Sequence, residues 1–419
     1  MNGRRWNMFT TGDMLPSMRA LVVLLAVSFA ACGDDDGSAP LDAAMTPDAG
    51  SDGGTTVRPD LAMPMCPPGE PMPDAFDCTT DPGVPLGEPI EAEADTWTWV
   101  PFDDAHCMDG SSTGIGIRTA PESDRLLILL EGGGACFDVF SCVAVANPDG
   151  YGEAAFASDA ARGLNRGITS RTDESNPFRD WNMVYVPYCS GDAHAGTAAD
   201  GTGFDGRTQT GHTNYGQFVA RIAATFPDVS QVVLAGRSAG GLGTLVNYPV
   251  TASAFGCTPV HVLDDSGPLL PDEYMRPCLV SMVNAEWSIA IPEGCDLCSC
   301  EGDAGLVNSI PFLARRYPDR RFGLASYTED RTFRSFFGFG YSSGCDIPRS
   351  VPDGEYTAGL LELRELMGGD ANFRTFLVEG DQHTFTFGSL GSASAGGLTL
   401  GEWTQQLIDG DAAWSDVGP

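Results

Sequence analysis

The stretch that most constrains the fold runs from Gln231 to Tyr248 and reads QVVLAGRSAGGLGTLVNY. Its apolar, β-branched start predicts a short buried strand, and the strand leads directly into Gly-Arg-Ser-Ala-Gly at 236–240. A segment that can be helical follows. Strand, sharp turn and helix in that order form the context in which a G-x-S-x-G pentapeptide presents its serine, here Ser238, as a nucleophile. In a chain with 52 glycines the pentapeptide alone can arise by chance. The prediction therefore depends on whether the chain also supplies a base, an acid and an oxyanion hole.

The charge of the chain limits its partners. Its 419 residues include 57 acidic and 23 basic side chains, which gives a formal net charge of −34. Such a chain repels phosphates, so we predict no nucleic-acid partner. The length allows one large α/β domain or two smaller ones. No cofactor is predicted, and a monomer is the default expectation.

The N-terminal residues 1–32 resemble a bacterial lipoprotein signal peptide. Arginines precede an apolar run at 21–27, and this run is too short to span a bilayer permanently. The run is followed by Phe-Ala-Ala-Cys, in which Cys32 would be lipidated and become the mature N-terminus. Phe29 replaces the usual leucine, so ordinary secretory cleavage is the alternative. The chain is therefore predicted to be exported, with a lipid anchor as its only link to a membrane.

Residues 33–85 are rich in Asp, Ala, Gly and Pro and contain few aromatic residues. This composition cannot bury a core, and it predicts a disordered acidic tether. The folded domain is predicted to occupy residues 86–419.

The cysteines indicate an exported protein. Without Cys32, twelve of the thirteen remain, an even number that allows complete pairing. Cys66 and Cys78 are predicted to fasten the far end of the tether. The run C-x-x-C-x-C at 295–300 has no neighbouring histidine to complete a zinc site, so we predict disulfides and no metal there.

An apolar run, Leu126–Leu130, ends in a cluster of glycines at 132–134. The run predicts a strand buried on both faces of a parallel sheet. In α/β-hydrolases such a cluster lets backbone N–H groups converge on an oxyanion. We predict that Gly133 and Gly134 donate from this side and Ala239, after Ser238, from the other.

The remaining chain predicts an α/β domain with a mostly parallel sheet and helices on both faces. Residues 137–180 have no regular pattern, 215–226 have helical spacing, and 271–318 predict a helical cap stapled by disulfides. Further strands are predicted at 96–102, 115–117, 181–188, 260–263, 322–327 and 373–378.

In α/β-hydrolases the nucleophile is followed by the acid and then by the histidine, which lies after the last strand. His383 follows the last strong strand and is the predicted base, whereas His261 lies inside a strand and is predicted to be structural. Asp330 follows the preceding strand and is the predicted acid. Glu329 is an alternative acid, and so are the aspartates at 264–265, of which Asp265 is also predicted to support the turn at Ser238 from beneath.

These motifs resemble the pectin acetylesterase/Notum family from about Trp97 to His383. The segments that carry the resemblance are LEGGGAC at 130–136, WN at 181–182 with YCSGD at 188–192, AGRSAGG at 235–241 and LDDSG at 263–267. The resemblance implies an α/β-hydrolase-like fold, a Ser-Asp-His triad, no metal and an extracellular ester substrate. Two departures stand out. Gly134 replaces an aromatic residue and so removes a wall of the acyl pocket, and Arg237 replaces a smaller residue.

We therefore predict an extracellular serine carboxylesterase that removes acetyl groups, with a polysaccharide such as acetylated pectin as the leading substrate. One alternative is an esterase for longer acyl chains or small-molecule esters. The other is a non-catalytic binding protein on the same fold.

Overall fold

The computed structural model describes Cys66 and residues 71–198, 200–342, 344–345 and 348–419. The predicted signal peptide, Cys32 and most of the predicted tether lie outside the described residues, so the domain boundaries stay predictions. Among the described residues, no helix has both the length and the apolar character that a membrane crossing requires.

The described domain is built on an eight-stranded sheet in the order β1-β2-β4-β3-β5-β6-β7-β8. The first two strands pair antiparallel with each other, and β2 pairs antiparallel with β4, whereas all pairs from β4 to β8 are parallel. The predicted mostly parallel sheet is thus confirmed. The strands are β1 Thr98–His106, β2 Ser112–Arg118, β3 Arg125–Leu130, β4 Asn182–Val186, β5 Gln231–Arg237, β6 Val260–Asp265, β7 Phe322–Tyr327 and β8 Phe373–Val378.

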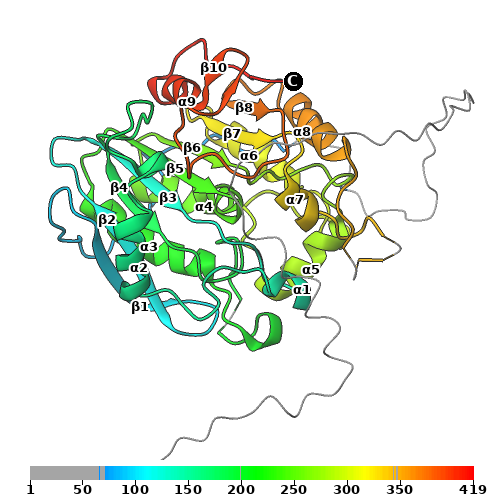
Figure 1. The fold of residues 1–419 in the computed structure, drawn as a ribbon, viewed down its shortest axis with the longest axis horizontal. Helices are drawn as coiled ribbons and strands as arrows, with labels where there is room; N and C mark the ends of the chain where they lie inside the picture. The colour runs from blue at the N-terminus through cyan, green and yellow to red at the C-terminus, as the bar shows by residue number, and fades with distance from the viewer. Residues whose placement is uncertain (1–65, 67–70, 199, 343, 346–347) are drawn as a thin grey trace, which may run out of the picture. The chain divides into compact units, whose positions relative to one another are not determined.

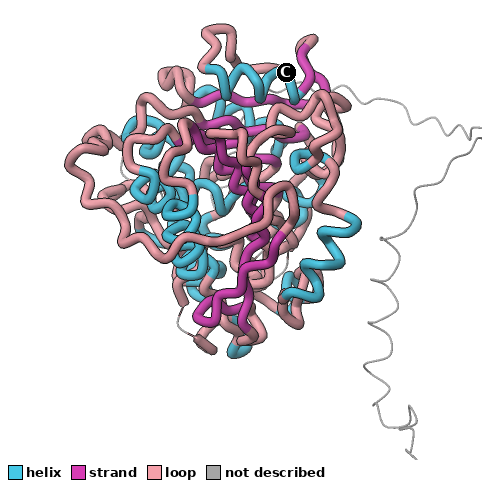
Figure 2. Tube along the Cα trace, turned by 90° about the vertical axis from the view of Figure 1, so that its left-hand side faces the viewer, coloured by secondary structure: helices cyan, strands magenta, loops and turns pink. Residues whose placement is uncertain are grey.

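Helices cover both faces of the sheet, as Figures 1 and 2 show. The helices are α1 Val139–Cys142, α2 Glu153–Arg162, α3 Gly211–Thr225, α4 Ala239–Phe255, α5 Pro277–Trp287, α6 Ser309–Arg316, α7 Arg331–Phe336, α8 Glu355–Leu366 and α9 Leu400–Asp409. Short 3₁₀ turns lie at Gly167–Thr169, Phe204–Gly206, Glu301–Asp303 and Leu306–Asn308, and a small hairpin joins β9 Ser394–Ala395 to β10 Leu398–Thr399.

The central strand β3 divides its side chains between two apolar cores. Ile128 belongs to the core under α3, α4, α5, α6 and α8, whereas Leu127 and Leu129 belong to the core under α2 and α9. Successive side chains of a strand point to opposite faces, so a strand with helices on both sides must be apolar throughout. This requirement explains the unbroken apolar run.

The order of the strands brings two loops together. From β3 the chain moves to β4 on one side and later returns to β5 on the other. Ligands in open α/β sheets bind at such a reversal, outside the carboxyl ends of the strands. Leu130 and Gly236 are in register there, so the glycine cluster and the turn at Ser238 leave the sheet side by side.

The stretch 137–180 differs from its prediction because it contains α1 and α2. The sequence of α2 is alanine-rich, with only Phe156 buried, so it has no apolar stripe that a periodicity argument could detect. The predicted helical cap is present as α5 and α6.

All twelve described cysteines form disulfides, including the three of the C-x-x-C-x-C run. Two of the bonds, at Cys66 and Cys78, fasten described parts of the predicted tether to the domain. The pairs are Cys66–Cys300, Cys78–Cys257, Cys107–Cys189, Cys136–Cys142, Cys278–Cys345 and Cys295–Cys298.

Candidate active site

Ser238 occupies the sharp turn between β5 and α4. Its φ of 55° and ψ of −122° are strained for a residue with a side chain, and its N–H donates to the carbonyl of Asp265 at 2.8 Å. A side chain at Gly236 would collide with the carbonyl of Gly240, and one at Gly240 with the carbonyl of Leu130. The two glycines are therefore required for the close approach of strand and helix.

The glycine cluster lies directly against this turn. A Cβ atom on Gly132 would be 2.8 Å from the Cβ of Ser238. Gly133 and Gly134 have φ of 158° and 83°, in the region that favours glycine. Among the described residues, no acceptor takes the N–H groups of Gly133, Gly134 or Ala239.

The three free N–H groups suit a developing negative charge. Ala239 is the first residue of α4, where unpaired N–H groups and the helix dipole favour an anion. On the other side, the Tyr188 hydroxyl donates to the carbonyl of Gly134 at 2.9 Å and accepts the N–H of Ala193 at 2.8 Å. Tyr188 thus fixes the loop at residues 131–136 that carries the glycine cluster, called the glycine loop below. The sequence analysis did not predict this role, although it noted the YCSGD segment.

His383 and Asp330 are in direct contact. The Nδ1 atom of His383 is 2.7 Å from Oδ2 of Asp330, whose side chain is fully buried. The other oxygen of Asp330 accepts the N–H groups of Thr332 and Phe333 at the start of α7. The described structure has no hydrogen bond between Ser238 and His383; such bonds are often long until substrate is bound.

The alternative acids are engaged elsewhere. Glu329 accepts the N–H of Gly354 and the hydroxyl of Thr357, and it pairs with Arg334 at 3.1 Å. The carboxylate of Asp265 accepts the backbone N–H groups of residues 385 and 386, just after His383. The side chain of Asp265 therefore supports the loop at residues 383–387, called the histidine loop below, and its backbone carbonyl supports the turn at Ser238.

Asp264 is buried next to the start of α4. Burial, with the neighbouring Asp265, raises the pKa of its carboxyl well above the usual range. Its Oδ1 has no hydrogen-bond partner among the described residues. Among the described residues, His383 is hydrogen-bonded to Asp330 and not to Asp264.

Two other histidines have structural contacts. His194 lies with its Nε2 atom 2.8 Å from the carbonyl of Glu131, and burial lowers its pKa. His261 accepts the N–H of Arg321 at Nδ1, and burial lowers its pKa to about 4. These contacts agree with the prediction that His261 is structural.

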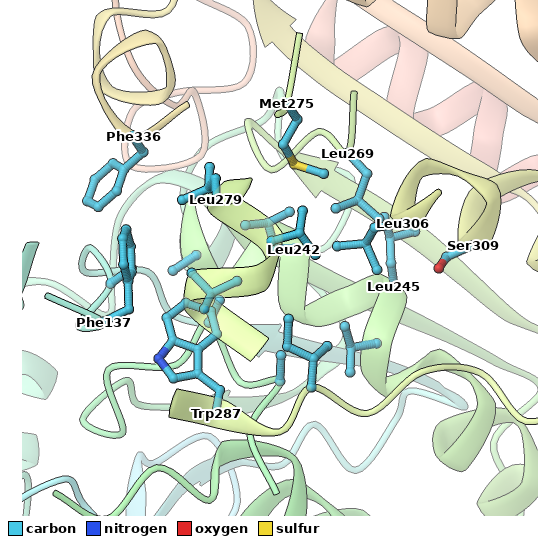
Figure 3. Close-up of a pocket in the computed structure, with 18 of the residues that line it drawn as sticks. Phe137, Leu242, Leu245, Leu269, Met275, Leu279, Trp287, Leu306, Ser309 and Phe336 are labelled. Atoms are coloured by element: carbon cyan, nitrogen blue, oxygen red, sulfur yellow. The ribbon is translucent and has the colours of Figure 1, made fainter. Parts of the chain in front are cut away.

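Ser238 lines an apolar pocket, and Figure 3 shows the side chains that form its walls. The volume of the pocket is about 110 Å³. By the same measure, one enclosed water molecule needs about 10–15 Å³. Ser238, Ala239 and Gly134 line one part of it, and the rest is almost entirely hydrocarbon from α4, α5, α7 and the loops around them. The labelled side chains in Figure 3 are Phe137, Leu242, Leu245, Leu269, Met275, Leu279, Trp287, Leu306, Ser309 and Phe336.

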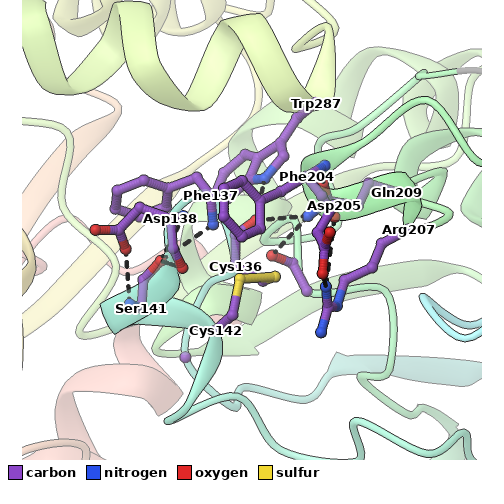
Figure 4. The surroundings of a disulfide bond; sticks show 12 residues. Cys136, Phe137, Asp138, Ser141, Cys142, Phe204, Asp205, Arg207, Gln209 and Trp287 are labelled. Atoms are coloured by element: carbon purple, nitrogen blue, oxygen red, sulfur yellow. Dashed lines mark hydrogen bonds and ion pairs between the residues drawn. A yellow bond between two sulfur atoms is a disulfide. The ribbon is translucent and has the colours of Figure 1, made fainter. Parts of the chain in front are cut away.

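The cap that forms this pocket is tied to the glycine loop. The indole Nε1 of Trp287 donates to the carbonyl of Cys136 at 2.8 Å, and its ring meets Phe137 edge to face (Figure 4). The disulfide between Cys136 and Cys142 closes the loop behind Phe137. One wall of the pocket and the predicted oxyanion hole are therefore parts of one segment.

Comparison with known proteins finds similarity to a family over part of the chain. A model of the family described as Pectinacetylesterase matches residues 98–277. Palmitoleoyl-protein carboxylesterase NOTUM of Drosophila melanogaster is 30% identical over 210 residues, which is 45% of this chain and 31% of that protein. Palmitoleoyl-protein carboxylesterase notum1 of Xenopus laevis is 30% identical over 216 residues, 47% of this chain and 44% of the relative. The chain thus spans less than half the length of these relatives.

Proposed function

We propose that this chain, which matches the Pectinacetylesterase family model over residues 98–277 and is similar to the NOTUM carboxylesterases, is a serine carboxylesterase. Ser238 is the nucleophile, His383 the general base and Asp330 the acid that orients it. The contact that supports this assignment is the 2.7 Å hydrogen bond between His383 and the buried Asp330. The N–H groups of Gly133, Gly134 and Ala239 form the oxyanion hole.

The reaction proceeds through an acyl-enzyme. Oγ of Ser238 attacks the ester carbonyl carbon while Nε2 of His383 takes its proton, and the carbonyl oxygen becomes an oxyanion held by the three N–H groups. When the intermediate collapses, the bond to the alcohol oxygen breaks and His383 gives its proton to the leaving alcohol. Water then attacks the acyl-enzyme, with His383 as base, and releases the carboxylic acid.

The pocket supports a long, apolar acyl group as the substrate, in preference to acetyl. Each buried CH₂ contributes about 0.8 kcal/mol, and an acetyl group would leave most of the hydrocarbon-lined space beyond Ser238 unused. The curated relatives are named as palmitoleoyl-protein carboxylesterases, which is in keeping with a fatty acyl group. We therefore propose the longer acyl chain, which the sequence offered as the alternative, as the substrate class.

A chain-length series tests this proposal. Nitrophenyl esters from acetyl to palmitoyl are hydrolysed by the wild type and by Ser238→Ala, with Ser253→Ala as control. Ser253 lies near the far end of the same helix, where it donates to Asp81. We expect kcat/KM to rise from acetyl to medium and long chains, Ser253→Ala to match the wild type, and Ser238→Ala to be inactive.

Other results identify the alternatives. A maximum at acetyl would favour the polysaccharide acetylesterase predicted from sequence. An inactive wild type on every ester would favour the non-catalytic binding protein. An active Ser238→Ala would exclude Ser238 as the nucleophile.

The proposal includes export. The six disulfides among the described residues and the match to the Pectinacetylesterase family model support an extracellular protein. A lipid anchor on Cys32 is a further part of the proposal, to be tested by metabolic labelling with palmitate. The label should enter the wild type and be absent from Cys32→Ser. An unlabelled wild type would contradict the lipid anchor and favour secretion without one.

A further inference from the structure

Arg237, the residue before Ser238, is an unusual neighbour for a nucleophile. Its side chain is only 5% exposed, and its Nε atom lies 3.4 Å from Oε1 of Glu131, which is 14% exposed. The centre of the guanidinium group lies 3.9 Å from the ring centre of Phe387. A planar guanidinium can pair at its edge and stack on its face at the same time. Arg237 therefore bridges two segments that are far apart in sequence.

The partner Glu131 belongs to the glycine loop. Its carboxylate oxygen Oε1 also accepts the N–H of Gly132 at 3.1 Å. Because Leu130 and Gly236 are in register on neighbouring strands, Glu131 and Arg237 are the next pair as the strands end. The ion pair thus lies where the glycine loop and the turn at Ser238 diverge.

The partner Phe387 belongs to the histidine loop, four residues after His383. Phe387 is 56% exposed, and the guanidinium group of Arg237 packs against its ring. Asp265 holds the backbone of the same loop at residues 385 and 386. The stack adds a second attachment, and this one leads directly to the residue beside the nucleophile.

We infer that Arg237 is a positioning residue that holds the glycine loop and the histidine loop in place relative to Ser238. The inference rests on the proposed function, because it assigns a role in the same reaction. Loss of one oxyanion donor typically lowers kcat by about 10²–10³-fold, and a misplacement of about 1 Å can cost about 10²-fold. A loosened loop should therefore lower kcat strongly, whereas KM should change much less, because most of the pocket lining comes from α4, α5 and α7.

The test compares Arg237→Met with Arg237→Lys. Rates are divided by the number of active sites titrated with a fluorophosphonate, so that misfolded protein does not count. We expect Arg237→Met to lose about 10–100-fold in kcat, with KM changed by less than about threefold. Arg237→Lys keeps a positive charge opposite Glu131 but loses the planar stack on Phe387. Its kcat should therefore lie between that of the wild type and that of Arg237→Met.

The control is Arg315→Met. Arg315 lies on α6 and is 18% exposed, and it pairs with Asp370 at 3.1 Å, so this variant also removes an arginine from a carboxylate pair. Arg315→Met should lower the melting temperature but leave kcat for each titrated site at the wild-type level. A buried charge left without its partner can also prevent folding. The double variant Glu131→Gln/Arg237→Met removes both charges and avoids this difficulty.

Phe387→Leu is the second independent variant, because its exposed ring is not needed for folding. We expect it to lower kcat by about 3–10-fold with KM unchanged. The inference is overturned if the folded Arg237 variants and Phe387→Leu keep kcat within twofold of the wild type. It is also overturned if KM rises while kcat stays constant, since Arg237 would then bind substrate. A wild type that hydrolyses no ester contradicts the proposed function itself and is seen before any variant is made.

Discussion

Asp330 makes one contact with His383 and another with the start of α7. Two different substitutions can distinguish the effects of these contacts on activity and on stability. Its Oδ2 atom holds Nδ1 of His383, and its Oδ1 atom caps α7 by accepting the N–H groups of Thr332 and Phe333. In Asp330→Asn, an amide oxygen can still cap the helix. The amide NH₂ then faces Nδ1, which favours the histidine tautomer with its proton on Nε2. That tautomer cannot accept the proton of Ser238.

The magnitudes follow from these contacts. In a Ser-His-Asp triad the change to asparagine lowers kcat by about 10⁴-fold, which corresponds to about 5 kcal/mol of transition-state stabilisation. The retained cap should keep the loss of folding stability small. Asp330→Ala removes the cap as well and should cost a further ~1–2 kcal/mol of unfolding free energy.

The assay measures kcat/KM on the best ester of the chain-length series and the unfolding free energy in urea. Glu329→Gln is the matched control, because Glu329 is the adjacent acid, and its pair with Arg334 is partly exposed to solvent. We expect Glu329→Gln to keep nearly full activity. The assignment of Asp330 as the acid is wrong if Asp330→Asn keeps more than a tenth of wild-type activity, or if Glu329→Gln loses as much.

Three further predictions concern the pocket, the glycine loop and pH. Val283→Trp fills the pocket and should abolish hydrolysis of palmitoyl esters while sparing acetyl esters; equal losses on both would contradict the pocket assignment. Gly132→Ala places a Cβ atom 2.5 Å from the carbonyl of Arg237, and it should lower kcat per titrated site without removing fluorophosphonate labelling. The pKa of His261 is about 4 in the folded chain, against 6.5 when unperturbed. The unfolded chain therefore binds the extra proton between these values, and stability falls as pH falls, by about 2 kcal/mol from pH 7 to pH 5. The unfolding free energy of His261→Gln, measured in urea, should depend less on pH than that of the wild type. An unchanged pH dependence would contradict the lowered pKa of His261.

Local sequence patterns predicted the sheet because its strands are encoded locally. The run at Leu126–Leu130 is apolar throughout, which a strand between two helical layers requires. The turn at Ser238 was predictable for the same reason, since the strand, the turn and the helix are contiguous. Chain order then selected His383 and Asp330, which lie together in the structure although 53 residues separate them.

Features that depend on contacts between distant segments were not predicted. Asp265 was assigned to support the turn at Ser238, but its carboxylate holds the loop 120 residues further on. The pocket is another example, because its walls come from the glycine loop, α4, α5 and α7, and no single segment has a pattern that announces a cavity. Helix α2 was missed because its alanine-rich sequence buries only Phe156 and so has no apolar stripe.

The glycine at position 134 illustrates how such contacts change a sequence argument. The sequence comparison predicted that Gly134, in place of an aromatic residue, removes a wall of the acyl pocket. In the structure Phe137 lines the pocket three residues later and packs edge to face against both Trp287 and Phe339. Trp287 also donates to the carbonyl of Cys136, so the aromatic wall is attached to the segment that carries Gly134 (Figure 4).

Movement of the cap would therefore displace the glycine loop. An acyl chain that fills the pocket and packs against Trp287 would favour the arrangement in which Gly133 and Gly134 face Ser238, so we expect chain length to influence kcat as well as KM.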